Sequence, residues 1–365
     1  MQLTTNMTEF ISTRILQHDA WEKLRSWYSE SKYRSIFVLV DSNTYQYCWP
    51  LLQSNLPEIP KFISIIPEGE SSKSIRLCEQ IWQEWLDHDI DRKSLVIACG
   101  GGVVCDLGGF CAATVLRGVD CVYVPTSLMA MADAAHGGKT AVNLASGKNL
   151  VGLFKFPKLI VLETDFLNTL DERQLKNGWV EMIKHGLISN PTYWKDFEQM
   201  SWPVGVESIK DYLRKSIRSK QEFVEKDPWE KDLRKALNFG HTIGHALESY
   251  LLDSGAVILH GEAIALGMIA EAYISYLRYA WPKELLNRIT RMLIPFACRN
   301  SLNLMDISMV LQRMKLDKKR KDGVPLFTLL QQPGIPVWDI PVTLDELNRA
   351  FEFCEFQLKT QETLK

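Results

Sequence analysis

Two histidines stand four residues apart in the stretch LNFGHTIGHALE, and other residues with metal-binding chemistry occur elsewhere in the same half of the chain. His241 and His245 would face one side of a helix, since residues i and i+4 are neighbours on a helix surface. His260 begins a further apolar stretch, and Glu181 precedes Lys184 by one helical turn in GWVEMIKHGLI. Three nitrogen or carboxylate ligands with an open position are typical of a catalytic zinc site. Histidines that serve only packing are the alternative.

A run of three glycines, Gly100 to Gly102, follows a strand-like segment at residues 95–98 and precedes a helix-like segment at residues 103–113. A loop without side chains lets the backbone approach a pyrophosphate, and a helix N-terminus adds N–H donors and the positive end of a dipole. Asp106 is expected in the first turn of that helix, where a carboxylate is favourable. The run is not a GxGxxG fingerprint, so a simple tight turn is the alternative.

Polar side chains follow several of the expected strands at the points where the strands end. They are Asp41, the pair Glu70 and Lys73, and the pair Thr126 and Ser127. In an open parallel sheet, ligands bind outside the carboxyl ends of the strands, where an acidic residue can hold ribose hydroxyls. Ordinary turns and helix caps use the same residue types, so both interpretations stay open at each position.

The segment DAAHGGKTAVNLASGKN combines Asp133, Lys139, Asn143, Lys148 and Asn149 with three glycines. We interpret it as a glycine-containing loop whose two lysines suit a phosphate or a polar sugar. A solvated surface loop is the alternative. The apolar residues on both sides of the segment favour a loop that is anchored to the domain.

The order of the expected elements predicts two domains. Residues 36–40, 62–66, 95–98 and 121–124 predict strands, with a helix at residues 74–86. This alternation is typical of βαβ units in a Rossmann-like parallel sheet. The later segments predict helices at residues 179–188, 205–226, 233–252, 261–279 and 283–297, with a strand at residues 325–330. We therefore predict an α/β domain at residues 1–165 and a mainly α-helical domain at residues 166–365.

Composition places the chain among globular proteins. Its 365 residues are 46% hydrophobic and 24% charged, which excludes a largely disordered or fibrous chain. The 42 basic and 44 acidic side chains leave no basic excess, so we expect no nucleic-acid partner. The eight cysteines include no CxxC pair and are expected to be buried and reduced. With no signal peptide or membrane span in the sequence, we expect a cytoplasmic protein without a membrane partner.

Six motifs in this order resemble 3-dehydroquinate synthases: GGGVVCDLGGFCAATVLRG, VPTSLMAMADAAHGGKTAVN, GKNLVGLFKFPK, WVEMIKHGLIS, LRKALNFGHTIGHALE and LHGEAIALGM. The resemblance extends from about Asp41 to the DKK stretch near residue 319. It implies an NAD-binding first domain and a second domain that binds a metal ion and substrate. Glycerol dehydrogenases share the fold and a histidine-based metal site, but the segments ADAAHGGKTAVN and GKN resemble the synthase.

The resemblance implies a lyase of the shikimate pathway, which leads to the aromatic amino acids. The substrate would be a sugar phosphate, 3-deoxy-D-arabino-heptulosonate 7-phosphate, and the products 3-dehydroquinate and phosphate. The implied cofactors are NAD⁺ and one divalent metal ion, Zn²⁺ or Co²⁺. The implied sequence is oxidation of a ring carbinol, elimination of phosphate, return of the hydride, ring opening and aldol closure. A metal ion would stabilise the developing alkoxide or enolate charge.

Functional residues are carried over from the motifs one by one. The implied metal ligands are Glu181, His241 and His260. The implied nucleotide contacts are Asp41, Glu70, Lys73, Gly101, Gly102, Val103, Asp106, Thr126, Ser127, Lys139, Lys148 and the turn from Phe166 to Thr169. The implied substrate and catalytic groups are Asp133, Lys139, Asn149, Lys184, Lys220, Arg234, Asn238, His245 and Lys318, with Lys319 as the alternative to Lys318. Arg117 matches an arginine that reaches the partner subunit's substrate phosphate, so the resemblance implies a homodimer.

The chain departs from the family pattern at three positions, Ala135, His136 and Ala141, where the family usually has Ser, a small or β-branched residue, and Gly. These residues lie beside expected nucleotide and substrate contacts, so they bear on efficiency and substrate choice. His136 is interpreted as a packing residue, with an altered pocket as the alternative. Another sugar phosphate cyclase and a glycerol-dehydrogenase-like oxidoreductase are the alternative functions.

Overall fold

The computed structural model describes residues 13–144, 147–200, 202–298, 307–314, 320–321 and 324–363. The chain divides into two compact units, Met1–Leu175 and Lys176–Lys365. The domain boundary after residue 165 stays a prediction. All eight cysteines belong to the described residues; seven are buried, Cys298 is half-buried, and none forms a disulfide. No described helix combines the length and apolarity that crossing a bilayer requires.

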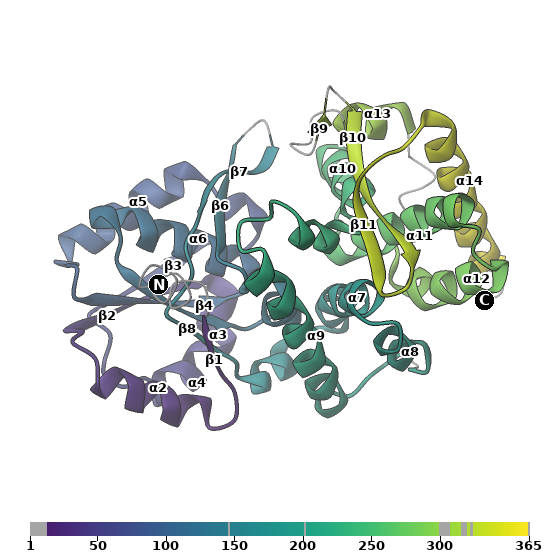
Figure 1. The fold of residues 1–365 in the computed structure, drawn as a ribbon. Helices are drawn as coiled ribbons and strands as arrows, with labels where there is room; N and C mark the ends of the chain where they lie inside the picture. Colours follow the sequence, from purple (N-terminus) through teal and green to yellow (C-terminus); the bar gives the residue numbers. More distant parts are fainter. Residues whose placement is uncertain are drawn as a thin grey trace, which may run out of the picture. The chain divides into compact units, whose positions relative to one another are not determined.

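The first unit is built on a six-stranded parallel sheet with strand order β1-β8-β5-β4-β2-β3 (Figure 1). The strands are β1 (Arg14–Leu16), β2 (Ser35–Asp41), β3 (Phe62–Ile66), β4 (Ser94–Gly100), β5 (Asp120–Pro125) and β8 (Leu159–Val161). Residues 36–40 and 95–99 are fully buried, as expected for central strands with both faces covered. The four predicted strands and the α/β class are confirmed, whereas β1 and β8 were not predicted.

Helices cover both faces of this sheet. Figure 1 shows α2 (Ala20–Ser29) and α4 (Trp49–Asn55) on one side and α5 (Ile75–Asp87) and α6 (Gly102–Thr114) on the other. The chain moves one way along the sheet from β1 to β3 and the opposite way from β3 to β5. Because parallel connections are right-handed, this reversal places the two sets of helices on opposite faces.

The segment interpreted as a glycine-containing loop is largely an antiparallel hairpin, so that interpretation was wrong. Asp133 lies in a short π-helical turn, Ala130–Ala134, and the hairpin pairs β6 (Lys139–Leu144) with β7 (Gly147–Phe154). Thr140 and Val142 are buried while their neighbours are less so, which is the period-two pattern of a strand. The glycines concealed this short alternation in the sequence.

The second unit is mainly helical, as predicted. Its helices are α7 (Glu172–Ser189), which begins just before the unit, then α8 (Tyr193–Glu198), α9 (Val206–Lys226), α10 (His241–Asp253), α11 (His260–Tyr279), α12 (Lys283–Leu293), α13 (Ile307–Met314) and α14 (Leu344–Thr363). Its strands are β9 (Arg320–Lys321), β10 (Val324–Gln332) and β11 (Ile335–Pro341). Helices α8, α13 and α14 and strands β9 and β11 were not predicted.

The single helix predicted over residues 233–252 is instead two elements. A 3₁₀ turn, Leu233–Asn238, is separated from α10 by Gly240, whose φ of 80° lies in the left-handed region. Such a backbone conformation favours glycine and interrupts a helix. The break makes His241 the first residue of α10.

Candidate metal, substrate and nucleotide sites

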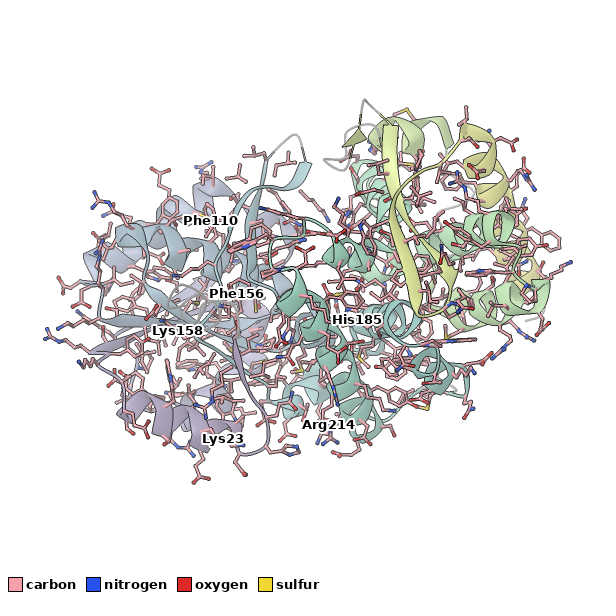
Figure 2. All side chains as sticks on the ribbon, viewed as in Figure 1. Lys23, Phe110, Phe156, Lys158, His185 and Arg214 are labelled. Carbon is pink, nitrogen blue, oxygen red and sulfur yellow. The ribbon has the colours of Figure 1, made fainter. Side chains whose placement is uncertain are left out.

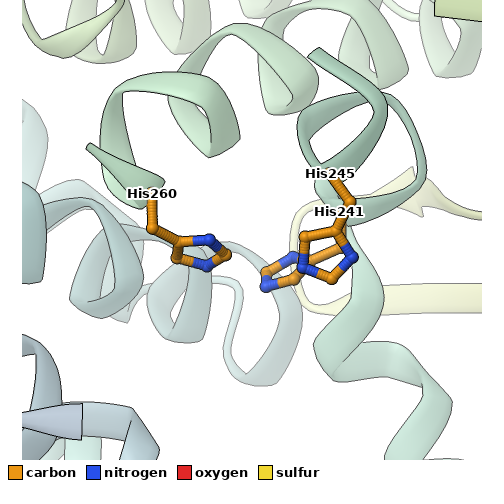
Figure 3. Close-up of side chains that lie close together, drawn as sticks. All are labelled: His241, His245 and His260. Carbon is orange, nitrogen blue, oxygen red and sulfur yellow. The ribbon is translucent and has the colours of Figure 1, made fainter. Parts of the chain in front are cut away.

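Three histidines from two helices converge in the second unit (Figure 3). His241 and His245 project from α10, and His260 is the first residue of α11. Their ring centroids are 5.0 to 5.5 Å apart, and one ring nitrogen of each lies within 4.8 Å of those of the others. Glu181, from α7, places its Oε1 3.5 Å from His241 Nε2 and 3.6 Å from His260 Nε2. The sequence-predicted ligand set is therefore brought together.

Glycines let the helices that carry these residues approach closely. A Cβ added at Gly267 of α11 would lie 2.0 Å from the carbonyl oxygen of Gly240, and one at Gly244 would lie 2.7 Å from the Ile264 side chain. A Cβ at Gly261 would lie 2.3 Å from the Asn177 carbonyl oxygen. Close approach of α7, α10 and α11 is thus built into the sequence, because only glycine fits at these contacts.

Buried polar groups fix the two helix starts that carry His241 and His260. Glu271 of α11 is fully buried, and its Oε2 accepts a hydrogen bond of 2.6 Å from the Gly240 N–H. Asn177 of α7 accepts one of 2.5 Å from the Gly261 N–H through its Oδ1. The first N–H groups of a helix have no partner within the helix, so these side chains satisfy donors that burial would leave unpaired.

The charged groups around Glu181 influence the protonation of His241 and His260. Lys184 Nζ lies 2.5 Å from Glu181 Oε2, and both side chains are buried. Burial and the nearby charge of Lys184 hold the pKa of His241 well below its ordinary value. Burial also lowers the pKa of His260, but the carboxylates of Glu248 and Glu181 outweigh burial and raise it to about 10.

The donor set fits a divalent transition metal. Two imidazole nitrogens and one carboxylate oxygen are the ligands that zinc takes in catalytic sites with an open position. Glu248 Oε2 lies 3.0 Å from His260 Nδ1, so the opposite nitrogen, Nε2, faces Glu181. A carboxylate behind a ligating histidine is the usual outer partner of such a ligand.

The other predicted residues of this unit are mostly buried. Lys220 and Arg234 are 5% and 2% exposed, and Arg234 donates 2.6 Å to the Pro228 carbonyl oxygen. Its backbone N–H donates 3.0 Å to Asp227 Oδ2. Asn238 donates 2.9 Å to Glu230 Oε1. Lys318 and Lys319 lie outside the described residues. His185, labelled in Figure 2, is buried, and one of its ring nitrogens, Nδ1, lies 2.6 Å from Ser216 Oγ.

The predicted nucleotide contacts gather at the carboxyl edge of the sheet in the first unit. Strand β2 ends at Asp41, β4 ends at Gly100 in the glycine run, and β5 ends at Pro125, directly before Thr126. Helix α6 begins at Gly102, and its first internal hydrogen bond joins the Cys105 N–H to the Gly101 carbonyl. The N–H groups before Cys105 therefore point out of the helix start. Added Cβ atoms would meet Ser127 at Gly101 and Ala134 at Gly102, so the glycines keep this start open.

Several of these residues have structural partners as well. Asp41 caps helix α3 (Ser42–Tyr47) by accepting 2.7 Å from the Thr44 N–H. Asp106 was expected in the first turn of α6, but it lies beyond that turn, where its Oδ2 accepts 2.7 Å from Lys73 Nζ. The carboxylate therefore acts on a buried lysine rather than on the helix dipole.

The structure also shows the surroundings of the other residues that the sequence predicted. Thr169 donates 2.7 Å to the Phe166 carbonyl oxygen, which closes the expected turn. Arg117 is exposed and has a φ of 66° at the end of a short 3₁₀ turn. Lys139 is exposed and Lys148 is half-buried on the hairpin. His136 is buried with Nε2 2.7 Å from the Met131 carbonyl oxygen, in agreement with a packing role.

Four residues that shape these sites had no role predicted from the sequence. Asn143 was noted without a role, and Asn177, Glu248 and Glu271 were not noted. Asn143 and Glu248 contact other proposed site residues, whereas Asn177 and Glu271 accept from backbone N–H groups at the helix starts that carry His260 and His241. Glu248 follows His245 by three residues and so shares its helix face, a spacing that could have indicated it. Glu271 and Asn177 lie far in sequence from the groups they hold, so no local pattern identifies them.

Comparison with solved structures defines the class of fold. A 2-epi-5-epi-valiolone synthase from Streptomyces hygroscopicus, with NAD⁺ and Zn²⁺ bound, superposes with a TM-score of 0.80 at 23% identity, covering 95% of this chain and 98% of that one. A 2-deoxy-scyllo-inosose synthase complexed with carbaglucose-6-phosphate, NAD⁺ and Co²⁺ gives a TM-score of 0.78 at 23% identity, covering 93% and 95%. The fold is that of the sugar phosphate cyclases.

Sequence comparison then identifies the family. Profiles described as 3-dehydroquinate synthase N-terminal and C-terminal match residues 63–177 and 178–320. A 3-dehydroquinate synthase from Parabacteroides distasonis is 35% identical over 348 residues, which cover 93% of this chain and 96% of the relative. The chain belongs to the 3-dehydroquinate synthase family.

Proposed function

We propose that this chain converts 3-deoxy-D-arabino-heptulosonate 7-phosphate into 3-dehydroquinate and inorganic phosphate. It would thereby act as a carbon–oxygen lyase of the shikimate pathway. The observation that carries this proposal is the convergence of Glu181, His241 and His260 in a chain of this family. The reaction has no net redox change, since a hydride is removed from a carbinol and returned to the same carbon.

Glu181, His241 and His260 would hold one divalent ion, Zn²⁺ or Co²⁺. Such an ion would supply Lewis-acid stabilisation of negative charge on substrate oxygens. Buried Lys184 would keep the Glu181 carboxylate oriented while carrying a charge that suits an anionic substrate. His245 has its ring beside the proposed ligands and is the residue we assign to proton transfer.

The carboxyl edge of the sheet and the start of α6 would bind NAD⁺, which would supply a reversible hydride acceptor. Backbone N–H groups at Gly102 and Val103 are placed to donate to a pyrophosphate at a helix N-terminus. The other proposed contacts are Asp41, Glu70, Lys73, Gly101, Asp106, Thr126, Ser127, Lys139, Lys148, Phe166 and Thr169.

Recognition of the phosphate and carboxylate would fall to cationic side chains. Lys220 and Arg234 are both buried, and a buried cation interacts strongly with an anion because solvent screens it little. We assign Asp133, Lys139, Asn149, Asn238 and Lys318 to the substrate as well. The contact from Arg117 would come from the partner subunit of a homodimer, and its exposure is compatible with that role. Eight cysteines without a disulfide support a cytoplasmic location.

The test is phosphate release from the heptulosonate phosphate, measured with and without NAD⁺ and with and without a chelator. Phosphate should accumulate only when both NAD⁺ and metal are present, while absorbance of reduced nicotinamide stays near baseline. Stoichiometric NADH formation from glycerol would instead identify the dehydrogenase alternative. Turnover of a different heptulose or hexose phosphate, without turnover of the heptulosonate, would identify another cyclase.

A further inference from the structure

Asn143, on strand β6, joins two groups of residues that have different proposed ligands. Its Nδ2 donates 2.8 Å to Glu70 Oε1, a proposed nucleotide contact. Its Oδ1 accepts 2.8 Å from the backbone N–H of Asn149, a proposed substrate contact on β7. One side-chain amide therefore spans from the segment after β3 to the far strand of the hairpin.

The orientation of this amide is determined by its partners. Glu70 Oε1 is an acceptor when ionised and the Asn149 N–H is only a donor, so turning the amide over would break both hydrogen bonds. The backbone is held too, because the Asn143 N–H donates 2.7 Å to the Lys73 carbonyl oxygen. Asn143 also pairs in parallel with Ser74, the N-cap residue of α5. These contacts tie Asn143 to the segment that leads into α5.

Lys73 closes the network from the other side. Its Nζ donates 2.7 Å to Asp106 Oδ2 and 2.6 Å to Asn149 Oδ1, and it lies 3.6 Å from Glu70 Oε1. Burial lowers the pKa of Lys73, but Asp106 and Glu70 outweigh burial and raise the pKa above its ordinary value. A lysine that stays charged here ties α6, the segment after β3 and the hairpin together.

Asn149 needs these contacts because of its backbone. Its φ of 53° lies in the left-handed region, which an asparagine adopts more readily than most residues but still at a cost. The hydrogen bond from its N–H to Asn143 and the bond from Lys73 to its side chain both favour that conformation.

We propose that Asn143 is a positioning residue that couples the nucleotide-binding side of the first unit, through Glu70, to the substrate-binding side, through Asn149. This inference rests on the proposed function, because it takes the nucleotide and substrate roles of those two residues from it. Asn143 itself would touch neither ligand. Its hydrogen bonds to Glu70 Oε1 and from the Asn149 N–H set where Glu70 presents its carboxylate and where Asn149 presents its side chain.

Two substitutions separate the two halves of this role. Asn143→Ala removes the bond to Glu70 Oε1, the longer bond of 3.4 Å to the Glu70 carbonyl oxygen and the bond from the Asn149 N–H. Asn143→Asp, assayed at pH 8, retains an oxygen that can accept from the Asn149 N–H but loses the donor to Glu70 and places a second carboxylate beside it. The control is Asn55→Ala, because Asn55 in the same unit also makes three side-chain hydrogen bonds away from the proposed site: to the Leu51 carbonyl, to Ser54 Oγ and from Arg25.

Three constants are measured on each folded protein: the Kd of NAD⁺ by calorimetry, and the KM and kcat for the heptulosonate phosphate at saturating NAD⁺. Asn143→Ala should raise the Kd of NAD⁺ by about tenfold or more, the range for losing a hydrogen bond to a charged group. It should raise the KM by about three- to tenfold, the range for losing the neutral bond from the Asn149 N–H. Asn143→Asp should raise the Kd of NAD⁺ similarly but leave the KM within about threefold of the wild-type value. Asn55→Ala should match the wild type in all three.

The outcomes are distinguishable. Wild-type values of the Kd of NAD⁺ and the KM in folded Asn143→Ala would overturn the inference alone. Equal increases in the KM for the Asp and Ala variants would also overturn it, since the Asn149 contact would then not be the one that matters. If the wild-type protein neither binds NAD⁺ nor releases phosphate, the proposed function fails and this inference falls with it. Should Asn143→Ala not fold, the comparison of Asn143→Asp with the wild type decides the coupling through Glu70.

Discussion

Removing the carboxylate behind His260 should weaken metal binding without removing a ligand. Glu248 Oε2 lies 3.0 Å from His260 Nδ1, and Glu248 is only 7% exposed. With Nδ1 donating to Glu248, the lone pair of Nε2 is directed toward the side where Glu181 lies. Glu248→Gln keeps a neutral acceptor in this place, whereas Glu248→Ala leaves none.

The magnitude follows from the type of hydrogen bond that is changed. A bond to a charged acceptor contributes about 1.5–3 kcal/mol and a bond to a neutral acceptor about 0.5–1.5 kcal/mol. Glu248→Gln should therefore cost about 1–1.5 kcal/mol, or about tenfold in metal affinity. Glu248→Ala should fall within the range of about 10- to 100-fold that is typical for lost outer partners of metal ligands.

The assay is competition for Zn²⁺ against a chromophoric chelator at constant pH, with the absorption spectrum of the Co²⁺ protein as a second measurement. The matched control is Glu262→Gln, because Glu262 also lies at the start of α11 and accepts 2.9 Å from the Leu259 N–H. Glu262→Gln should lower thermal stability slightly and leave the metal Kd unchanged. Metal affinities equal to the wild type in both Glu248 variants would refute the reasoning.

Three further predictions address the metal, the subunits and the pH dependence of stability. His241→Ala should abolish stoichiometric metal in elemental analysis, and a metal content equal to the wild type would contradict the ligand assignment. Arg117→Ala should lower kcat/KM for the substrate by about 1.5–3 kcal/mol, while the affinity for NAD⁺ stays nearly unchanged. Mixing the Arg117→Ala protein with the inactive Lys220→Ala protein should restore activity, because hybrid dimers would contain one intact site. If subunit exchange is proven and activity does not return, shared sites are excluded. Hydrogen bonding to Arg278 lowers the pKa of Glu346 to about 2, so the pair stabilises the fold above about pH 4.5 and loses this effect as the pH falls toward 2. Glu346→Gln should therefore lower the free energy of unfolding in urea by about 1–2 kcal/mol at pH 7, since partial solvent exposure weakens the pair, and a loss that does not shrink below pH 4 would contradict this account.

The sequence predicted those helices and strands whose apolar residues recur at a single, clear spacing. Strands β2 to β5 are short apolar runs, and α5, α9 and α11 have apolar residues at helical spacing, so each was recognised from its own segment. The hairpin of β6 and β7 was missed because its alternation is short and is bordered by glycines. Strands β1 and β8 have three residues each, and their pairing is a long-range contact that no local signal specifies.

The residues of the candidate site also divide into those that the sequence predicted and those that it did not. Glu181, His241 and His260 were predicted because their types and spacing, with the family motifs, indicate metal chemistry. Asn177 and Glu271 were not, since their function is to accept N–H groups from helix starts that are 84 and 31 residues away in sequence. Such contacts depend on how the helices pack, and packing is a tertiary property. Asp106 shows the same limit, because its partner Lys73 is 33 residues away.

The placement of two proposed ligands at helix starts explains why carboxyl groups surround this cluster. His241 and His260 are the first residues of α10 and α11, and the positive end of a helix dipole is unfavourable for a cation. Lys184 adds a further buried positive charge. Glu181, Glu248 and Glu271 oppose these charges from within 4 Å of the histidines or of the α10 start. Formally, three carboxylates balance Lys184 together with one divalent ion, so a neutral replacement at any of the three would leave excess positive charge at a buried site. Glu248 and Glu271 would therefore contribute to the electrostatics of the proposed metal site, although neither is expected to be a ligand.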